Sequence, residues 1–290
     1  MNWKKRQQGI FCYFCNPDIL ESRQYHSANS EIESRSGSRS NDPINPLKLN
    51  EVRPFVIDYD QRKNCKAVDK NNKRIETYYV KKTVRGGKNW HFFASVDKDF
   101  AECEKSNWNC EQNDDQLGYA YCQDALIEYV HVEGEEKDKM KARRCGIGST
   151  LAALCMVDKD VNPGDNIALN LKRYFRGHGK EIIEKVKKEC QKVVALEMEA
   201  EEGGGNTYFQ AAFRAGYNRM VLYDTKAKEW IWPDVLKAQE CYNEKKFGCY
   251  SNYWFFCKNS NPSDASSATP PACLESNPIT DEDECPKQNN

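Results

Sequence analysis

Residues 125–154, with the sequence ALIEYVHVEGEEKDKMKARRCGIGSTLAAL, constrain the fold of this chain most, because they place a strand, a glycine-containing turn and a helix in direct succession. An apolar, β-branched run leads into a charged loop, and apolar residues resume after the turn. Gly146 and Gly148 let the backbone approach a ligand closely, because glycine has no Cβ. The first amides of a helix have no intrahelical acceptor, and the helix dipole favours an anion beside them. The turn therefore predicts a phosphate cradle, to which Arg143 and Arg144 add positive charge.

The spacing of the two glycines separates this turn from other phosphate-binding loops. A P-loop needs four residues between its glycines and then Lys-Ser/Thr. The dinucleotide fingerprint needs a third glycine, where this chain has Leu151. The pattern Arg-x-x-Gly-x-Gly, filled by Arg143, Gly146 and Gly148, resembles the pyrophosphate loop of the GNAT superfamily of acyl-CoA N-acyltransferases.

A second segment follows in the order that the same family shows. Residues 193–198 are rich in β-forming side chains. Asn206 is suited to cap a short helix over 207–215, and Gly216 to end that helix in a left-handed conformation. Another strand is indicated at 219–223. The order of strand, helix, Ala-Gly-Tyr and strand resembles the second half of a GNAT domain.

The resemblance implies a fold of the α/β class, of the α+β type, with a mixed, mostly antiparallel GNAT-like sheet flanked by helices. We expect this domain over residues 51–232, with an insertion at about 157–190. A disordered Ser-rich tail at 1–50 precedes it, and a Cys-containing extension at 233–290, disordered from about 260, follows it. Further signals predict strands at 54–59, 75–84, 90–96 and 249–257, a hairpin around Gly86-Gly87, a loop at 101–115 and helices at 180–190 and 233–246.

The resemblance also implies a reaction, the direct transfer of an acetyl or other acyl group from acyl-CoA to a primary amine. Acetyl-CoA or another acyl-CoA is the implied cofactor, and the acceptor amine stays open. Backbone groups of Val130 and Val132 are expected to pair with the pantetheine arm like an added strand. The implied cofactor site also includes Asn206 and the two arginines, Arg143 and Arg144. Its remaining members are the backbone amides of Cys145, Gly146, Ile147, Gly148, Ser149 and Thr150.

Two side chains are the candidates for proton transfer in this reaction. Glu128 lies in the strand before the turn, where some GNAT members carry a general base, although it also reads as an outward-facing residue of a half-exposed strand. His131, on the opposite face of the strand, is the second candidate for the base. The family often places an acid tyrosine at the position of Ala212 in this chain. Tyr208 on the same helix is therefore the substitute candidate for the general acid, or a packing residue.

Composition excludes some classes of partner and leaves the compartment open. The formal net charge of −1 gives no basic field for nucleic acid, and no run of 18 apolar residues indicates a membrane span. The fourteen cysteines allow full disulfide pairing, but the absence of a convincing export signal favours reduced thiols in the cytoplasm. A disulfide at Cys155 or Cys190 is therefore unexpected, and Cys145 is expected to be a redox-sensitive thiol. The single Cys12-x-x-Cys15 pair, with His26 nearby, predicts no metal site.

Two alternatives to the enzyme come from other functional classes. The absence of a tyrosine at position 212 is consistent with a GNAT-like CoA-binding protein that has lost turnover. The cysteine content is consistent with a secreted, disulfide-stabilised interaction protein.

Overall fold

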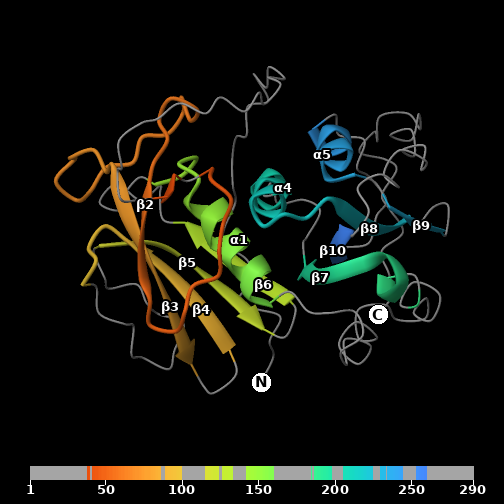
Figure 1. Ribbon diagram of the computed structural model, residues 1–290. Coiled ribbons are helices and arrows are strands. Elements are labelled where there is room, and N and C mark those ends of the chain that lie inside the picture. Colours follow the sequence, from red (N-terminus) through yellow and green to blue (C-terminus); the bar gives the residue numbers. More distant parts are fainter. Residues whose placement is uncertain are drawn as a thin grey trace, which may run out of the picture.

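The computed structural model describes residues 38–39, 41–85, 89–99, 115–123, 126–132, 142–159, 184, 186–197, 205–224, 229–232, 234–243 and 253–259. Within these residues the fold is a mixed α/β arrangement with one large sheet and three helices with defined bounds (Figure 1). The predicted class is therefore confirmed at this level.

The described strands form one sheet in the order β1-β2-β3-β4-β5-β6-β7-β10-β8-β9. Neighbouring strands are antiparallel except for β1 with β2 and β6 with β7, which are parallel. The bounds of the strands are β1 Ser38–Arg39, β2 Val52–Val56, β3 Thr77–Arg85, β4 Asn89–Ser95, β5 Gln116–Gln123, β6 Leu126–Val132, β7 Cys190–Glu197, β8 Arg219–Asp224, β9 Glu229–Ile231 and β10 Tyr253–Asn259.

Both ends of the described chain contribute to this domain beyond the limits expected from the sequence. Strand β10 pairs with β7 on one side and with β8 on the other, so the sheet extends past residue 232. Residues 41–50 pack onto the domain, where Ile44 and Leu47 are buried and the Ile44 amide donates to the Arg214 carbonyl. The sheet is therefore complete only when β10, the last described strand, inserts between β7 and β8.

Three helices with described bounds accompany the sheet: α1 Ile147–Lys159, α4 Gly205–Arg214 and α5 Val235–Asn243. Helix α1 packs against β4, β5, β6 and α4, and α4 packs against α5. The residues from Leu151 to Met156 are all fully buried. A helix that is apolar on all sides needs such an enclosed place, and the single hydrophobic core of the domain provides it.

Helix α4 ends as the sequence predicts. Gly216 has φ +79°, and its amide donates to the Phe213 carbonyl, while the Tyr217 amide donates to the Ala212 carbonyl. These two bonds form a Schellman motif, which satisfies carbonyls that the last helical turn leaves open. At its other end the helix begins at Gly205, two residues earlier than expected, so Asn206 lies inside it.

The strands expected early in the chain are present as β2, β3 and β4, and β3 pairs with β4 in the predicted hairpin. Strand β5 was not predicted from the sequence. It contains Gly118, where a Cβ would lie 2.4 Å from the carbonyl oxygen of His131 on β6. A glycine that permits so close an approach between strands also weakens the sequence signal for a strand.

Among the residues that the structure describes, three disulfides connect different parts of the core. Cys122 of β5 is bonded to Cys155 of α1, Cys190 of β7 to Cys257 of β10, and Cys65 to Cys145. The expectation that Cys155 and Cys190 stay unpaired was wrong, because each lies opposite a second buried cysteine on a neighbouring element. Cys145 is likewise bonded and is not a free thiol.

Candidate functional site

The predicted turn lies where expected, directly before α1. Arg144 has φ +63° and Gly146 has φ +82°, and the helix begins at Ile147. The Gly146 carbonyl accepts hydrogen bonds from Ser149 Oγ at 2.9 Å, from Thr150 Oγ1 at 2.9 Å and from the Thr150 amide at 3.0 Å. Gly146 is therefore the N-cap residue of α1.

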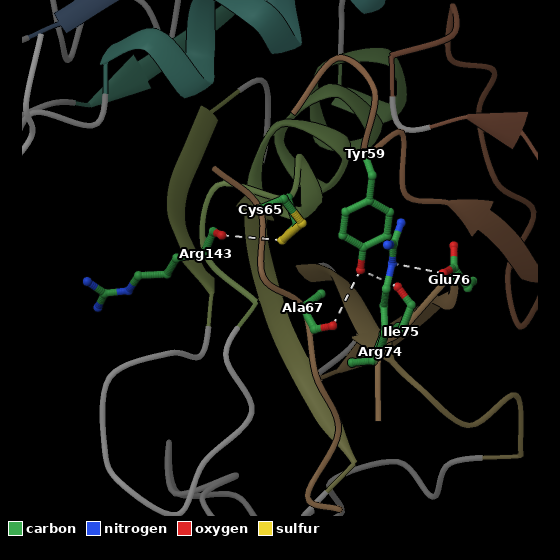
Figure 2. Close-up of a disulfide and its surroundings, with 8 residues drawn as sticks. Tyr59, Cys65, Ala67, Arg74, Ile75, Glu76 and Arg143 are labelled. Atoms are coloured by element: carbon green, nitrogen blue, oxygen red, sulfur yellow. Dashed lines mark hydrogen bonds and ion pairs between the residues drawn. A yellow bond between two sulfur atoms is a disulfide. The ribbon is translucent and has the colours of Figure 1, made fainter. Parts of the chain in front are cut away.

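A covering loop, defined here as residues 58–66, encloses one side of this turn. A Cβ on Gly146 would lie 2.6 Å from Nε and Cζ of Arg62, so the guanidinium stands where an N-cap side chain would begin. The disulfide between Cys65 and Cys145 joins the loop to the turn covalently, and Cys145 Sγ lies 3.3 Å from the Arg143 carbonyl oxygen (Figure 2). Cys145 is fully buried and Ile147 is 1% exposed. The predicted cradle is therefore enclosed on the Gly146 side.

Tyr59 fixes the covering loop to the rest of the domain. Its hydroxyl donates to the Ile75 carbonyl at 2.6 Å, and the guanidinium of Arg74 lies 3.7 Å from the centre of its ring (Figure 2). Burial raises the pKa of the Tyr59 hydroxyl. These contacts hold the segment that carries Arg62 and Cys65 against the first turn of α1.

The opposite flank of α1 faces strand β6 and helix α4. A Cβ on Gly148 would lie 3.2 Å from Val132 Cγ2, 3.4 Å from Thr207 Cγ2 and 3.9 Å from Val130 Cγ1. Val130 and Val132 are half-buried and pack against the core. The structure thus brings these predicted cofactor residues next to the predicted turn.

Strands β6 and β7 are parallel neighbours beside this flank. Their pairing consists of Leu126 with Ala195 and Ile127 with Leu196, and no further pair joins them among the described residues. On the other edge of β6 the register with β5 shifts at Glu128, which has no partner there because Ile127 pairs with Cys122 and Tyr129 with Tyr121. Such a bulge bends a strand and changes the direction of a side chain.

The predicted residues on α4 are engaged with their neighbours. Asn206 Oδ1 accepts a hydrogen bond from Gln239 Nε2 of α5 at 3.1 Å, and the Gly205 amide donates to the Tyr242 hydroxyl at 3.2 Å. Tyr208 is half-buried and packs against the hydrophobic core. Ala212, at the position of the family's acid, is fully buried.

His131 belongs to a group of stacked rings on the face of the sheet opposite α1. The ring centres of His131 and Tyr119 are 5.4 Å apart, and Tyr129 stacks on His131 and lies tilted against Tyr119. Tyr129 is 39% exposed, so the group reaches the surface. We call this set the aromatic face: His91, Phe93, Tyr119, Tyr121, Tyr129 and His131.

Sequence reasoning missed a buried polar network on the Gly146 side of α1. Arg214, only 7% exposed, donates from Nη1 to Thr150 Oγ1 at 2.6 Å and from Nε to the Asp42 carbonyl at 3.0 Å. The hydroxyl of the fully buried Tyr78 also donates to Thr150 Oγ1, at 2.8 Å. No signal in the sequence marks Arg214, which reads as a favourable basic residue in the last turn of α4.

Burial shifts both titratable groups of this network. The pKa of the Arg214 guanidinium is lowered to about 10, mainly by burial; Tyr78 and Asp42 oppose this decrease, and the nearby Arg62 adds to it. Burial also raises the pKa of Tyr78. The network therefore holds a costly buried cation against the first turn of α1.

Among the residues that the structure describes, no group of His, Cys, Asp or Glu is arranged to hold a metal ion. Cys12, Cys15 and His26 lie outside those residues. No helix in the described part of the chain is long and apolar enough to cross a membrane. Comparison with known proteins found no matching family model, no matching curated protein and no matching solved structure.

Proposed function

We propose that this chain is a disulfide-stabilised interaction protein of an oxidising compartment, secreted or facing the secretory pathway. The observation that carries the proposal is the set of three disulfides, each of which joins segments that are distant in sequence. Disulfides persist in oxidising environments and are rare in the cytosol of mesophiles. The proposed compartment therefore differs from the cytoplasm expected from the sequence.

Two features of the structure support binding rather than catalysis. The turn before α1 is enclosed by Arg62 and fixed by the bond between Cys65 and Cys145, which removes the thiol expected there. On the aromatic face Tyr129 is exposed and Tyr119 and His131 beside it are half-buried, whereas the other three rings are buried. Tyrosine is enriched at protein interfaces, because its ring is apolar and its hydroxyl can form a hydrogen bond.

Thiol counting tests the compartment half of this proposal. The full chain would be denatured and alkylated with iodoacetamide, with and without prior reduction, and weighed by mass spectrometry. Six of the fourteen cysteines belong to the three disulfides, so at most eight should react before reduction. Peptide mapping should recover Cys65 linked to Cys145. Alkylation of all fourteen cysteines without prior reduction, in protein secreted from cells, would remove the proposal.

A second candidate is an acyl-CoA site of the GNAT type, active or without turnover. The observation that favours it is the packing of Gly148, in the predicted turn, against Val130 and Val132 of β6 and Thr207 of α4. In that reading Val130 and Val132 bind the pantetheine arm, and the amides of the turn bind the pyrophosphate. Glu128, at the bulge of β6, takes the proton of the amine, and Tyr208 returns a proton to the leaving thiolate.

Titration with CoA separates the two candidates. A bound ligand at a hundredfold excess over its dissociation constant stabilises the folded state by about 2.7 kcal/mol. Gly148→Val should abolish that stabilisation, because the new side chain would enter the space between Val130, Val132 and Thr207. Gly216→Ala, at the far end of α4, is the matched control. Stabilisation without acyl transfer to a panel of amines indicates a binding protein, and no stabilisation by CoA removes the second candidate.

A further inference from the structure

One surface segment between β2 and β3 is strongly basic. We call residues 61–74 the basic segment; it comprises the end of the covering loop and the hairpin that follows it. Its charged residues are six cations and the single carboxylate of Asp69, so its formal charge is +5 in a chain whose total is −1. The cations are Arg62, Lys63, Lys66, Lys70, Lys73 and Arg74. The remainder of the chain is therefore acidic on balance.

A hairpin orders the second half of the basic segment. Residues 67–69 pair with residues 73–75 in antiparallel orientation. The Asp69 carboxylate accepts hydrogen bonds from the backbone amides of Asn71 at 2.9 Å and of Lys73 at 2.8 Å. The one carboxylate of the segment is therefore used to fix the turn of the hairpin.

The basic segment is also held against the domain. Cys65 is bonded to Cys145, and the Tyr59 hydroxyl donates to the Ile75 carbonyl at 2.6 Å (Figure 2). Ala67 is 1% exposed and Ile75 is 6% exposed, and both belong to the hydrophobic core. A surface that is already ordered loses less conformational entropy when it binds a partner.

Three lysines of the basic segment present their charge to solvent. Lys63, Lys66 and Lys73 are exposed, and none of them forms an ion pair with another residue that the structure describes. Such cations are fully hydrated and available to an external anion.

The neighbouring carboxylates offset this charge only in part. Four of them border the basic segment: Asp58, Asp60, Glu76 and Asp115. Asp58 is buried. Asp115 Oδ1 lies 3.6 Å from Lys70 Nζ, and Glu76 Oε1 lies 2.9 Å from Arg74 Nε. Ion pairs this exposed contribute little, so an external polyanion can replace them at small cost.

The lysines are spread over a length that a small anion cannot bridge. Lys66 and Lys70 lie on either side of the paired residues 67–69. A strand rises by about 3.3 Å per residue, so the backbones of these two lysines are about 13 Å apart. A single sulfate or phosphate reaches one of them, whereas a polymer with repeated negative charges contacts both.

We propose that the basic segment binds a sulfated polysaccharide of the cell surface or extracellular matrix. This partner rests on the proposed function, because such polymers lie outside the cell. Dense clusters of Lys and Arg are typical of patches that bind heparin or nucleic acid, and the oxidising compartment favours the first of these. The cations without a partner are lysines, which act as compact point charges and suit a densely charged polymer, whereas arginine is the better match for single carboxylates.

Fluorescence anisotropy with the full, oxidised chain tests this partner. The probe is a fluorescein-labelled heparin oligosaccharide at physiological ionic strength. We expect saturable binding that weakens as NaCl is added, because salt screens the attraction and opposes the release of counterions from the polyanion. The desulfated oligosaccharide and poly-glutamate should compete less well, since both carry fewer charges per unit length. Double-stranded DNA should also compete less well, since only one side of a duplex faces the segment.

A triple variant removes the three lysines that have no ion pair: Lys63→Gln, Lys66→Gln and Lys73→Gln. It should weaken heparin binding by more than about tenfold, since each lysine beside a polyanionic surface contributes roughly fivefold. The fold should tolerate the change, because all three side chains are exposed.

The matched control replaces three surface lysines elsewhere: Lys187→Gln, Lys188→Gln and Lys237→Gln. The first two directly precede β7 and the third lies on α5, both in the part of the molecule away from β2 and β3 (Figure 1). Both triple variants lose the same net charge, so a general effect of charge would weaken binding equally in both. We expect the control to bind heparin as the wild type does.

The outcomes separate this partner from the proposed function. Equal affinities of the two triple variants overturn the assignment to the basic segment. Tighter binding of poly-glutamate or DNA than of heparin, compared at equal charge, identifies a different class of partner and also overturns it. A chain that has its disulfides but shows no saturable binding of heparin loses this partner and keeps the proposed function. Fourteen free thiols remove the proposed function, and this partner with it.

Discussion

Removal of the bond between Cys65 and Cys145 tests whether the covering loop is a constitutive part of this fold. The change is the double replacement Cys65→Ala with Cys145→Ala, which leaves no single thiol to mispair. The bond closes a loop with a sequence separation of 80 residues. In the chain-entropy model, a loop of that length corresponds to about 4.5 kcal/mol of stabilisation.

That cost is large beside the total stability of a domain, which is about 5–15 kcal/mol. For a domain of this size each kcal/mol shifts Tm by about 2–4 °C, so the loss corresponds to roughly 9–18 °C. The measurement is equilibrium unfolding in urea without reductant, followed by circular dichroism. We expect a lower midpoint and a steeper slope, because the unfolded chain without the bond is less compact and exposes more surface.

The other two disulfides provide internal controls. All six cysteines are buried, so the packing lost on replacement by alanine is similar in each pair. Loss of the Cys190–Cys257 bond, with a separation of 67, should cost only about 0.2 kcal/mol less, and loss of the Cys122–Cys155 bond, with a separation of 33, about 0.8 kcal/mol less. A cost below about 1 kcal/mol for the Cys65–Cys145 pair would refute the reasoning, because it would mean that the bond does not constrain the unfolded chain.

Three further changes test the packing around α1. Tyr78→Phe should cost about 1–2 kcal/mol at neutral pH through the lost bond to Thr150. Burial raises the pKa of Tyr78, so the folded chain keeps a proton that the unfolded chain releases above about pH 10. The free energy of unfolding of the wild type should therefore fall above that pH, and its difference from that of Tyr78→Phe, measured in urea, should narrow. A difference that stays constant with pH would contradict this. Gly216→Ala should cost about 1–2 kcal/mol in thermal unfolding, since a side chain is strained at φ +79°, and a neutral result would argue against the left-handed end of α4. Asp158→Asn should cost about 3–5 kcal/mol in urea unfolding, because it removes the carboxylate charge that pairs with the buried Lys82, whereas replacing both partners with Leu and Met should recover most of that loss; equal losses in the single and double variants would contradict the pairing.

The local sequence determined those features of the fold that depend only on residues close together in the chain. The strand, turn and helix at 125–154 are present as β6, the turn at Gly146 and α1. The end of α4 at Gly216 is also as expected, since only a residue without a Cβ adopts that conformation without strain. Both predictions rest on backbone preferences and on hydrogen bonds that span only a few residues.

The tertiary structure alone decided the features that join distant segments. The sequence counts fourteen cysteines but does not say which of them meet, and the three bonds depend on how sheet, helix and covering loop come together. The return of β10 to the interior of the sheet and the approach of Arg62 and Arg214 to the first turn of α1 are equally non-local. A glycine turn before a helix therefore predicts exposed amides from sequence, whereas packing determines which flank of the turn is enclosed and which faces β6 and α4.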